Sequence, residues 1–201
     1  MRPPADGALL PLQRGLERLY RLDEAPDVVD FVLPADQPII REELLVRQTR
    51  DGVEIRLVLD GRLLLGARNI EDYFLLVEGV SHYLCVVFRA RQRRPVTALE
   101  LELQAEVDKF MTCLAMWRRR RAGPPPQGLA RRTLDRFRIA PHLQSALRAR
   151  YRTAATLARR YCTSLESRYV KSGRLRDLGD ELRRFYRMGL DQKRAFIDQH
   201  I

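Results

Sequence analysis

Apolar residues near the N-terminus recur every three or four positions until a group of prolines interrupts the pattern. The apolar positions are Leu9, Leu12, Leu16, Leu19 and Tyr20, and the prolines are Pro26, Pro34 and Pro38. A period near 3.6 is that of an amphipathic helix, and proline cannot continue one. The pattern therefore predicts a short helix over residues 9–21, followed by loop.

From residue 43 the period changes to two. Apolar and polar residues alternate over 43–49 and over 53–59, and Asp-Gly pairs stand at 51–52 and 60–61. Alternation is typical of a strand with one buried face, and Asp-Gly between two such runs is a hairpin signal. We expect an antiparallel meander with strands near 43–49, 53–59 and 62–66.

The pattern over residues 69–90 fits two structures. Ile70, Tyr73, Phe74 and Val77 share one helical face, whereas residues 83–88 are rich in β-formers, and Gly79 stands between the two patterns. The interpretation we favour is a helix over 69–78 followed by a buried strand over 81–89. One continuous helix through residue 90 remains open as the alternative.

After Pro95 a long helix is predicted over residues 97–117. Thr97 and Glu100 form a capping-box pattern, and apolar residues then recur at spacings of three and four up to Trp117. The acidic residues on the remaining side are expected to face solvent, and the arginines that follow, at 118–121, are expected to complement the negative end of the helix dipole. These acidic residues are Glu100, Glu102, Glu106 and Asp108.

The second half of the chain is predicted to be helical. Residues 122–128 (Ala-Gly-Pro-Pro-Pro-Gln-Gly) indicate a semi-rigid linker. The helical period then returns over 143–169, ends at Gly173, and resumes over 175–185 and 190–201. The chain is thus interpreted as an α+β domain over 1–121, the linker, and a basic helical region over 129–201 that packs on the first domain or pairs with a second copy in a homodimer. The fold class is α+β, with a small antiparallel β-meander packed by helices.

Charge is distributed unevenly between the two halves. Residues 1–117 hold 15 Lys and Arg against 19 Asp and Glu, whereas residues 118–201 hold 22 against 7. Such asymmetry indicates a polyanionic or acidic partner. No signal peptide and no run of 18 apolar residues is present, so a soluble, cytoplasmic protein without a membrane span is expected. The cysteines Cys85, Cys113 and Cys162 are expected to be reduced thiols.

Candidate catalytic and metal-binding residues are few. Glu78, His82 and Cys85 would share a face only in the single-helix alternative, where they would resemble the parts of a cysteine nucleophile. Glu78 with His82, and Glu102 with Glu106, are each one helical turn apart, as metal ligands can be. The chain contains no Glu-x-x-His pair. No metal or cofactor is therefore predicted, and enzymatic activity stays open as the least supported functional class.

The basic helices give the main functional hypothesis. Arg148, Arg152 and Arg159 fall within about 40° of one another on a helical wheel, so they can follow a phosphate backbone. The rest of the predicted nucleic-acid site comprises Arg131, Arg132, Arg183 and Arg184, and a wider field adds Arg136, Arg138, Arg187, Lys193 and Arg194. The predicted function is a nucleic-acid-associated binding protein. The alternative is an adaptor or scaffold whose basic helices bind an acidic protein, again without enzymatic activity.

Overall fold

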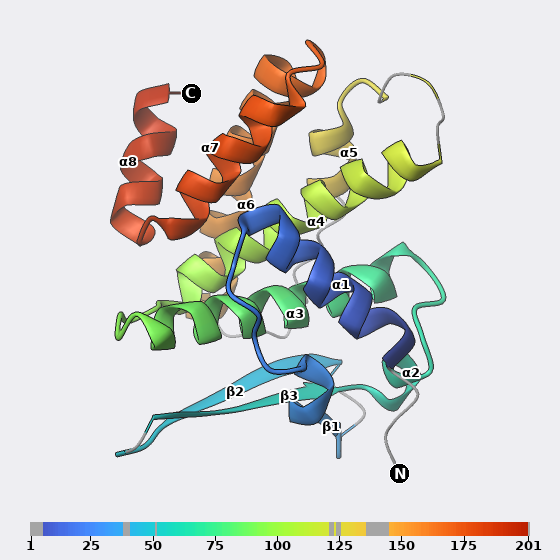
Figure 1. The fold of residues 1–201 in the computed structure, drawn as a ribbon, viewed down its shortest axis with the longest axis vertical. Helices are drawn as coiled ribbons and strands as arrows, with labels where there is room; N and C mark the ends of the chain where they lie inside the picture. Colours follow the sequence, from blue (N-terminus) through green and yellow to red (C-terminus); the bar gives the residue numbers. More distant parts are fainter. Residues whose placement is uncertain are drawn as a thin grey trace. The chain divides into compact units, whose positions relative to one another are not determined.

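The computed structural model describes residues 6–37, 41–50, 52–120, 123, 126–135 and 145–200. The chain divides into two compact units, Met1–Pro95 and Val96–Ile201 (Figure 1). The first unit combines helices with a three-stranded sheet, and the second consists of helices, so the α+β fold class is confirmed. The predicted linker at 122–128 falls inside the second unit, and residues 122, 124 and 125 lie outside the described ranges.

The sheet of the first unit contains β1 (Val32–Pro34), β2 (Glu42–Gln48) and β3 (Val53–Leu59) in the order β1-β3-β2. The β2–β3 hairpin is antiparallel as predicted, but β1 pairs with β3 in parallel, so the sheet is not a meander. The strand predicted at 62–66 is also wrong, because residues Gly61–Leu64 form the short helix α2. Asp60 caps this helix by accepting a hydrogen bond from the backbone N–H of Arg62 at 2.8 Å, as Asp does at N-caps.

Three helical segments accompany the sheet: α1 (Asp6–Tyr20), the 3-10 turn η1 (Val28–Phe31) and α3 (Ile70–Arg91). The predicted N-terminal helix is confirmed by α1. The favoured helix-plus-strand interpretation of 69–90 is wrong, and the single-helix alternative is correct. Asn69 caps α3 by accepting from the N–H of Asp72, and the β-forming residues at 83–86 are buried as part of this helix. Tertiary burial has overridden local strand propensity.

Gly79 lies in the middle of α3 because the helix closely approaches the sheet. A Cβ atom at this position would lie 2.8 Å from Cδ1 of Leu57 on β3 and 3.3 Å from Oε1 of Glu42 on β2. Leu57 itself is fully buried. The glycine is therefore a packing requirement inside a continuous helix, which is why it gave a false signal of a break.

Helix α3 also has the length and composition of a membrane span. Its 22 residues include an 18-residue window with a mean hydropathy of 1.3, yet 72% of that window is buried inside the structure. Such burial is what the core helix of a folded domain requires.

The second unit contains α4 (Ala98–Arg119), α5 (Leu129–Leu134), α6 (Ser145–Leu165), the π-helical turn η2 (Glu166–Val170), α7 (Leu175–Arg187) and α8 (Leu190–His200). The helices predicted over 97–117 and 175–185 are confirmed, the one over 190–201 is confirmed up to residue 200, and the long 143–169 helix is confirmed from residue 145. Residues 143, 144 and 201 lie outside the described ranges. Gly173, with φ of +71°, ends that segment in the left-handed region that glycine favours. Tyr161, Phe185 and Phe196 form the aromatic core of the second unit, and the rings of Tyr161 and Phe185 are stacked with their centroids 4.0 Å apart.

The packing role of Gly79 leads to the first prediction. We expect Gly79→Ala to lower the free energy of unfolding by about 1–3 kcal/mol, because the added methyl group overpacks against buried Leu57. Gly15→Ala in α1 is the matched control, since its Cβ would meet no atom within 4 Å. The control should be neutral or stabilising by up to about 1 kcal/mol. Urea unfolding of both variants makes the comparison, and equal stabilities would contradict it.

Candidate functional site

The helical second unit buries most of its acidic side chains. Of its 11 Asp and Glu residues, six are less than 8% exposed. They are Glu100, Glu102, Glu106, Asp108, Glu166 and Glu181. The prediction that the four acidic residues of α4 face solvent is therefore wrong. A buried carboxylate is costly unless charged or hydrogen-bonding groups surround it, so each of these residues must have partners.

The acidic residues of α4 have partners of two kinds. Lys109, on the same helix, places its Nζ 2.7 Å from Oε1 of Glu106. A guanidinium nitrogen of Arg150 on α6 lies 3.7 Å from Oε1 of Glu102. With these cationic partners, the charged face of α4 can lie in the interior of the unit.

Lys193 on α8 is fully buried and connects that helix to α4. Its Nζ donates a hydrogen bond of 3.0 Å to Oε1 of Gln104 and lies 3.7 Å from Oε1 of Glu100. It also sits 5.2 Å from the centroid of the Phe185 ring. The prediction that Lys193 belongs to a phosphate-binding field is wrong, because the side chain is in the interior.

Glu166 holds the short helix α5 in place. Its carboxylate accepts three backbone hydrogen bonds, from the N–H groups of Gly128 at 2.8 Å, Leu129 at 3.1 Å and Ala130 at 2.9 Å. These are unpaired donors at a helix N-terminus, where a carboxylate is favourable. Because α5 has only six residues, this anchoring also fixes the backbone that carries Arg131 and Arg132.

Glu181 on α7 is held by Arg168 and Tyr169 of the π-helical turn. Arg168 donates to both carboxylate oxygens, at 2.7 and 2.6 Å, and the Tyr169 hydroxyl donates at 2.7 Å. Burial favours the neutral acid and would raise the pKa of Glu181, but the hydrogen bonds from Arg168 and Tyr169 outweigh it and lower that pKa. The hydrogen bond with Glu181 in turn raises the pKa of Arg168.

The burial of carboxylates leaves the exterior of this unit strongly basic. Of the 20 lysines and arginines that the structure describes in residues 96–201, only Lys109 and Lys193 are buried. Five acidic residues remain outside the interior, namely Asp135, Asp177, Asp180, Asp191 and Asp198. Eighteen cationic side chains therefore share the accessible surface with five carboxylates.

The structure brings part of the predicted nucleic-acid site together around Asp135. Oδ1 of this residue lies 2.6 Å from Arg159 on α6, and Oδ2 lies 3.1 Å from Nε of Arg131 on α5. Arg132 is exposed beside Arg131. Arg152 is exposed two helical turns before Arg159 on the same face, and Arg148 is half-buried one turn further. We call Arg131, Arg132, Arg148, Arg152 and Arg159 the α5–α6 basic surface.

The two remaining arginines of that site lie on α7. Arg183 pairs with Asp180 at 2.7 Å, and the guanidinium of Arg184 sits 5.1 Å from the centroid of the Phe196 ring. No hydrogen bond or ion pair among the described residues joins Arg184 to the α5–α6 basic surface. Of the wider field, Arg194 is exposed, Arg187 donates to the carbonyl of Arg183, and Arg136 and Arg138 lie outside the described residues.

An apolar hollow of about 590 Å³ lies on the same unit. Trp117 at the end of α4, with Val170 and Leu175, forms part of its wall, and Arg118 and Lys171 stand among its lining residues. Both of these cations are exposed. The hollow therefore adds apolar contact area beside positive charge.

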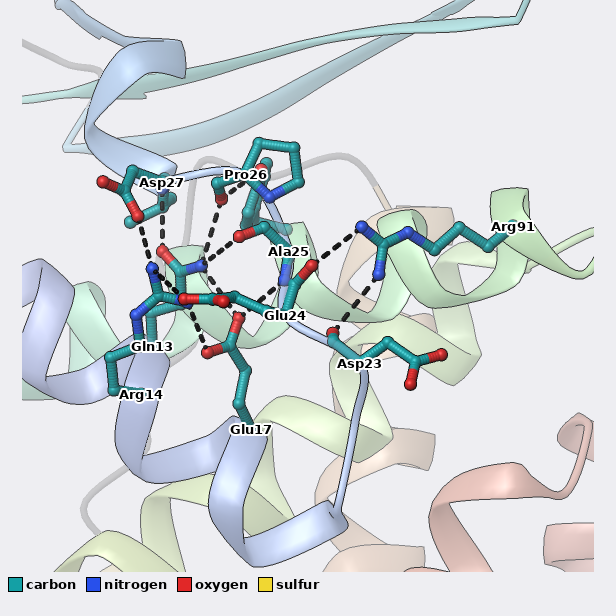
Figure 2. Close-up of polar contacts among 11 residues, drawn as sticks. Gln13, Arg14, Glu17, Asp23, Glu24, Ala25, Pro26, Asp27 and Arg91 are labelled. Carbon is teal, nitrogen blue, oxygen red and sulfur yellow. Dashed lines mark hydrogen bonds and ion pairs between the residues drawn. The ribbon is translucent and has the colours of Figure 1, made fainter.

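In the first unit, a polar network fixes the loop after α1 (Figure 2). The Gln13 side chain accepts from the N–H of Val28 at 2.8 Å and donates to Glu17 and to the carbonyl of Pro26. Arg91 on α3 donates to the carbonyls of residues 23 and 24. Most of these hydrogen bonds end on backbone groups of residues 23–28, so we interpret the network as structural.

The Glu78, His82 and Cys85 constellation lies on one helix, because α3 is continuous. All three residues are buried. The structure adds a second carboxylate that sequence reasoning missed, because donor atoms of Glu42, Glu78 and His82 lie within 4.8 Å of one another. The strand predicted from the alternation starts at residue 43, so the pattern contained no signal for Glu42, which in the structure occupies an inward-facing position at the start of β2.

The Arg168–Glu181 pair leads to the second prediction. Because the pKa of Glu181 is lowered in the folded protein, its stabilising contribution is present above the unfolded pKa of about 4.3 and is lost as the pH falls through the lower folded value. We expect Glu181→Gln to reduce the free energy of unfolding by about 2 kcal/mol at pH 7, and by progressively less below about pH 4.

The control for this prediction is Asp177→Asn on the same helix. Asp177 pairs with Arg174 at 2.6 Å, but both side chains are about half exposed, so the loss should stay below about 0.5 kcal/mol. Thermal unfolding of both variants and the parent between pH 3 and pH 7 tests the difference. A Glu181→Gln effect that did not change with pH would refute the electrostatic origin.

Comparisons of this chain with protein-family models, with curated proteins and with solved structures find no match.

Proposed function

We propose that the protein binds a polyanion, most directly the phosphate backbone of a nucleic acid, through the exposed arginines of its helical second unit. The observation that carries this proposal is the segregation of charge: six of 11 carboxylates of the unit are buried, while 18 described cations are not. A positive field of this kind attracts polyanions from a distance. When its arginines neutralise phosphates, the counterions condensed on the nucleic acid are released, which favours binding.

The α5–α6 basic surface is the proposed centre of contact. Arg152 and Arg159 repeat along one face of α6 with a separation of about 10 Å, at 1.5 Å per residue. Arg131 and Arg132 add charge from α5, whose N-terminus is fixed by Glu166. Such contacts give affinity and orientation without reading base sequence, so we expect binding to be insensitive to sequence.

A protein partner is the second candidate, and one observation favours it. Strand β2 is at the edge of the sheet in the first unit, and Leu45, Val46 and Val53 of the hairpin are 39–48% exposed. An exposed apolar edge strand can pair with a strand of another chain. Binding of this kind buries apolar surface, so it should depend only weakly on salt.

The third prediction tests the phosphate contacts with two matched variants. The first replaces the exposed residues Arg132, Arg152 and Arg159 by Gln, and the second replaces three arginines of the first unit that are also exposed, Arg50, Arg62 and Arg68. Both variants lose three positive charges. Fluorescence anisotropy with a labelled random-sequence duplex and single strand, at 50 and 200 mM salt, measures the affinities.

We expect the parent and the first-unit variant to bind with a steep salt dependence. The Arg132, Arg152 and Arg159 variant should bind at least tenfold more weakly, and the slope of log K against log salt should fall by up to about 0.9 for each phosphate that is no longer neutralised. Equal weakening by the two variants would mean that net charge alone matters. Absence of binding by the parent at 50 mM salt would refute the proposed function, and a salt-independent oligomer in size exclusion would favour the edge strand.

A further inference from the structure

Two carboxylates and an imidazole converge in the first unit, where α3 faces the sheet. Glu78 and His82 are one turn apart on α3, and Glu42 is the first residue of β2. Their donor atoms lie within 4.8 Å of one another, and Nδ1 of His82 is 3.8 Å from Oε1 of Glu42. We propose that these three side chains bind a divalent first-row transition-metal ion, with Zn²⁺ as the first ion to test.

The position of Glu42 on the sheet is the first argument. Residues 42, 44 and 46 of β2 pair directly with Leu59, Leu57 and Ile55 of β3, which are all buried. Directly paired residues point to the same side of an antiparallel sheet, so Glu42 lies on the inner face. Its side chain is only 7% exposed at a position where the pattern calls for an apolar residue. A polar residue that breaks the core pattern in this way is characteristic of a functional site.

The opposing helix breaks its pattern at the same place. Glu78 and His82 are 8% and 6% exposed, and Gly79 stands between them. Because Gly79 has no side chain, the carboxylate of Glu42 approaches the helix backbone: a Cβ atom there would lie 3.3 Å from its Oε1. Two elements distant in the sequence thus present polar groups to one another across a small gap.

The donor set and spacing fit a transition metal. With metal–ligand distances near 2.0–2.2 Å, two ligands of a tetrahedral ion are about 3.4 Å apart. The 3.8 Å separation of Nδ1 and Oε1 is close to this, and the 4.8 Å limit is within reach of small side-chain rotations. Imidazole nitrogen beside carboxylate oxygen suits Zn²⁺, Mn²⁺ or Fe²⁺ better than Ca²⁺ or Mg²⁺, which take oxygen ligands.

The charge of such an ion also suits the site. Two ionised carboxylates at close range disfavour each other's charge, and a divalent cation neutralises both. Three protein ligands leave at least one coordination position for a water molecule. Bound in this way, the ion would join β2 to α3 and stabilise the folded chain by an amount that rises with the logarithm of the free metal concentration over Kd. This inference does not depend on nucleic-acid binding, because every ligand belongs to the first unit.

The fourth prediction concerns metal binding by the full chain after EDTA treatment and dialysis. We expect calorimetric titration with Zn²⁺ to give one ion per chain, mass spectrometry of the dialysed complex to retain it, and the melting temperature to rise on addition of Zn²⁺. Co²⁺ in its place should give visible absorption bands of a low-symmetry site. Glu42→Gln and His82→Gln should each weaken Zn²⁺ binding by at least about 100-fold.

Matched controls separate ligation from nonspecific effects. Glu43→Gln changes the neighbouring residue on the outer face of the same strand, and His200→Gln changes an exposed histidine, so both should bind Zn²⁺ like the parent. Circular dichroism verifies that each variant is folded. For the parent, ¹⁵N-histidine NMR gives a test that needs no variant, because the His82 ring resonances should shift with Zn²⁺ while those of His200 do not. Absence of stoichiometric binding, or an unchanged His82 resonance, would overturn the inference.

Discussion

The structure of the helical second unit depends on the requirement that a buried carboxylate have donors around it. Glu166 accepts three backbone N–H groups and thereby fixes the start of α5, and Glu181 joins α7 to the π-helical turn through Arg168 and Tyr169. The reverse case is Lys193, a buried cation that joins α8 to α4 through Gln104 and Glu100. These contacts specify which helices meet, and the aromatic core of Tyr161, Phe185 and Phe196 fills the space between them.

The same requirement explains the electrostatic character of the surface. Two of the interior carboxylates, Glu102 and Glu181, pair with Arg150 and Arg168, whereas most arginines of this unit lie on a surface that carries only five carboxylates. Most of the five remaining carboxylates pair with arginines, as Asp135 does with Arg131 and Arg159. An exposed ion pair of this kind contributes little to stability. The arginines of such pairs therefore remain accessible to a polyanion that offers several phosphates at once.

Much of the fold could be predicted where one period persisted over many residues. The helices α4, α6 and α7 and the β2–β3 hairpin were predicted from such periods. The prediction was wrong at residues 81–89, where tertiary burial keeps β-forming residues in a helix. It was also wrong at Gly79, because a glycine required by close packing against Leu57 has the same sequence signal as the end of a helix. It was also wrong for 62–66, because Asp60 caps a helix instead of leading into a turn.

The candidate sites were harder to predict, because their partners are distant in the sequence. Charged residues that recur with period 3.6 normally indicate a solvent-exposed helical face. The local sequence contains no sign that Lys193 and Arg150 contact the acidic residues of α4. The arginines of α5 and α6 were predicted from a helical wheel, but their link through Asp135 needed the packed structure. Glu42 was invisible beside Glu78 and His82 for the same reason, since only the packing of β2 under α3 brings them together.

The second unit buries six of its 11 carboxylates and leaves most of its arginines on the surface. Carbodiimide labelling of carboxyl groups at neutral pH, read by peptide mass spectrometry, measures this residue by residue. We expect slow labelling of Glu100, Glu102, Glu166 and Glu181, and fast labelling of the exposed residues Asp180, Asp191 and Asp198, with the difference lost in denaturant. Labelling of the α4 and α7 glutamates as fast as Asp198 in the folded protein would contradict it.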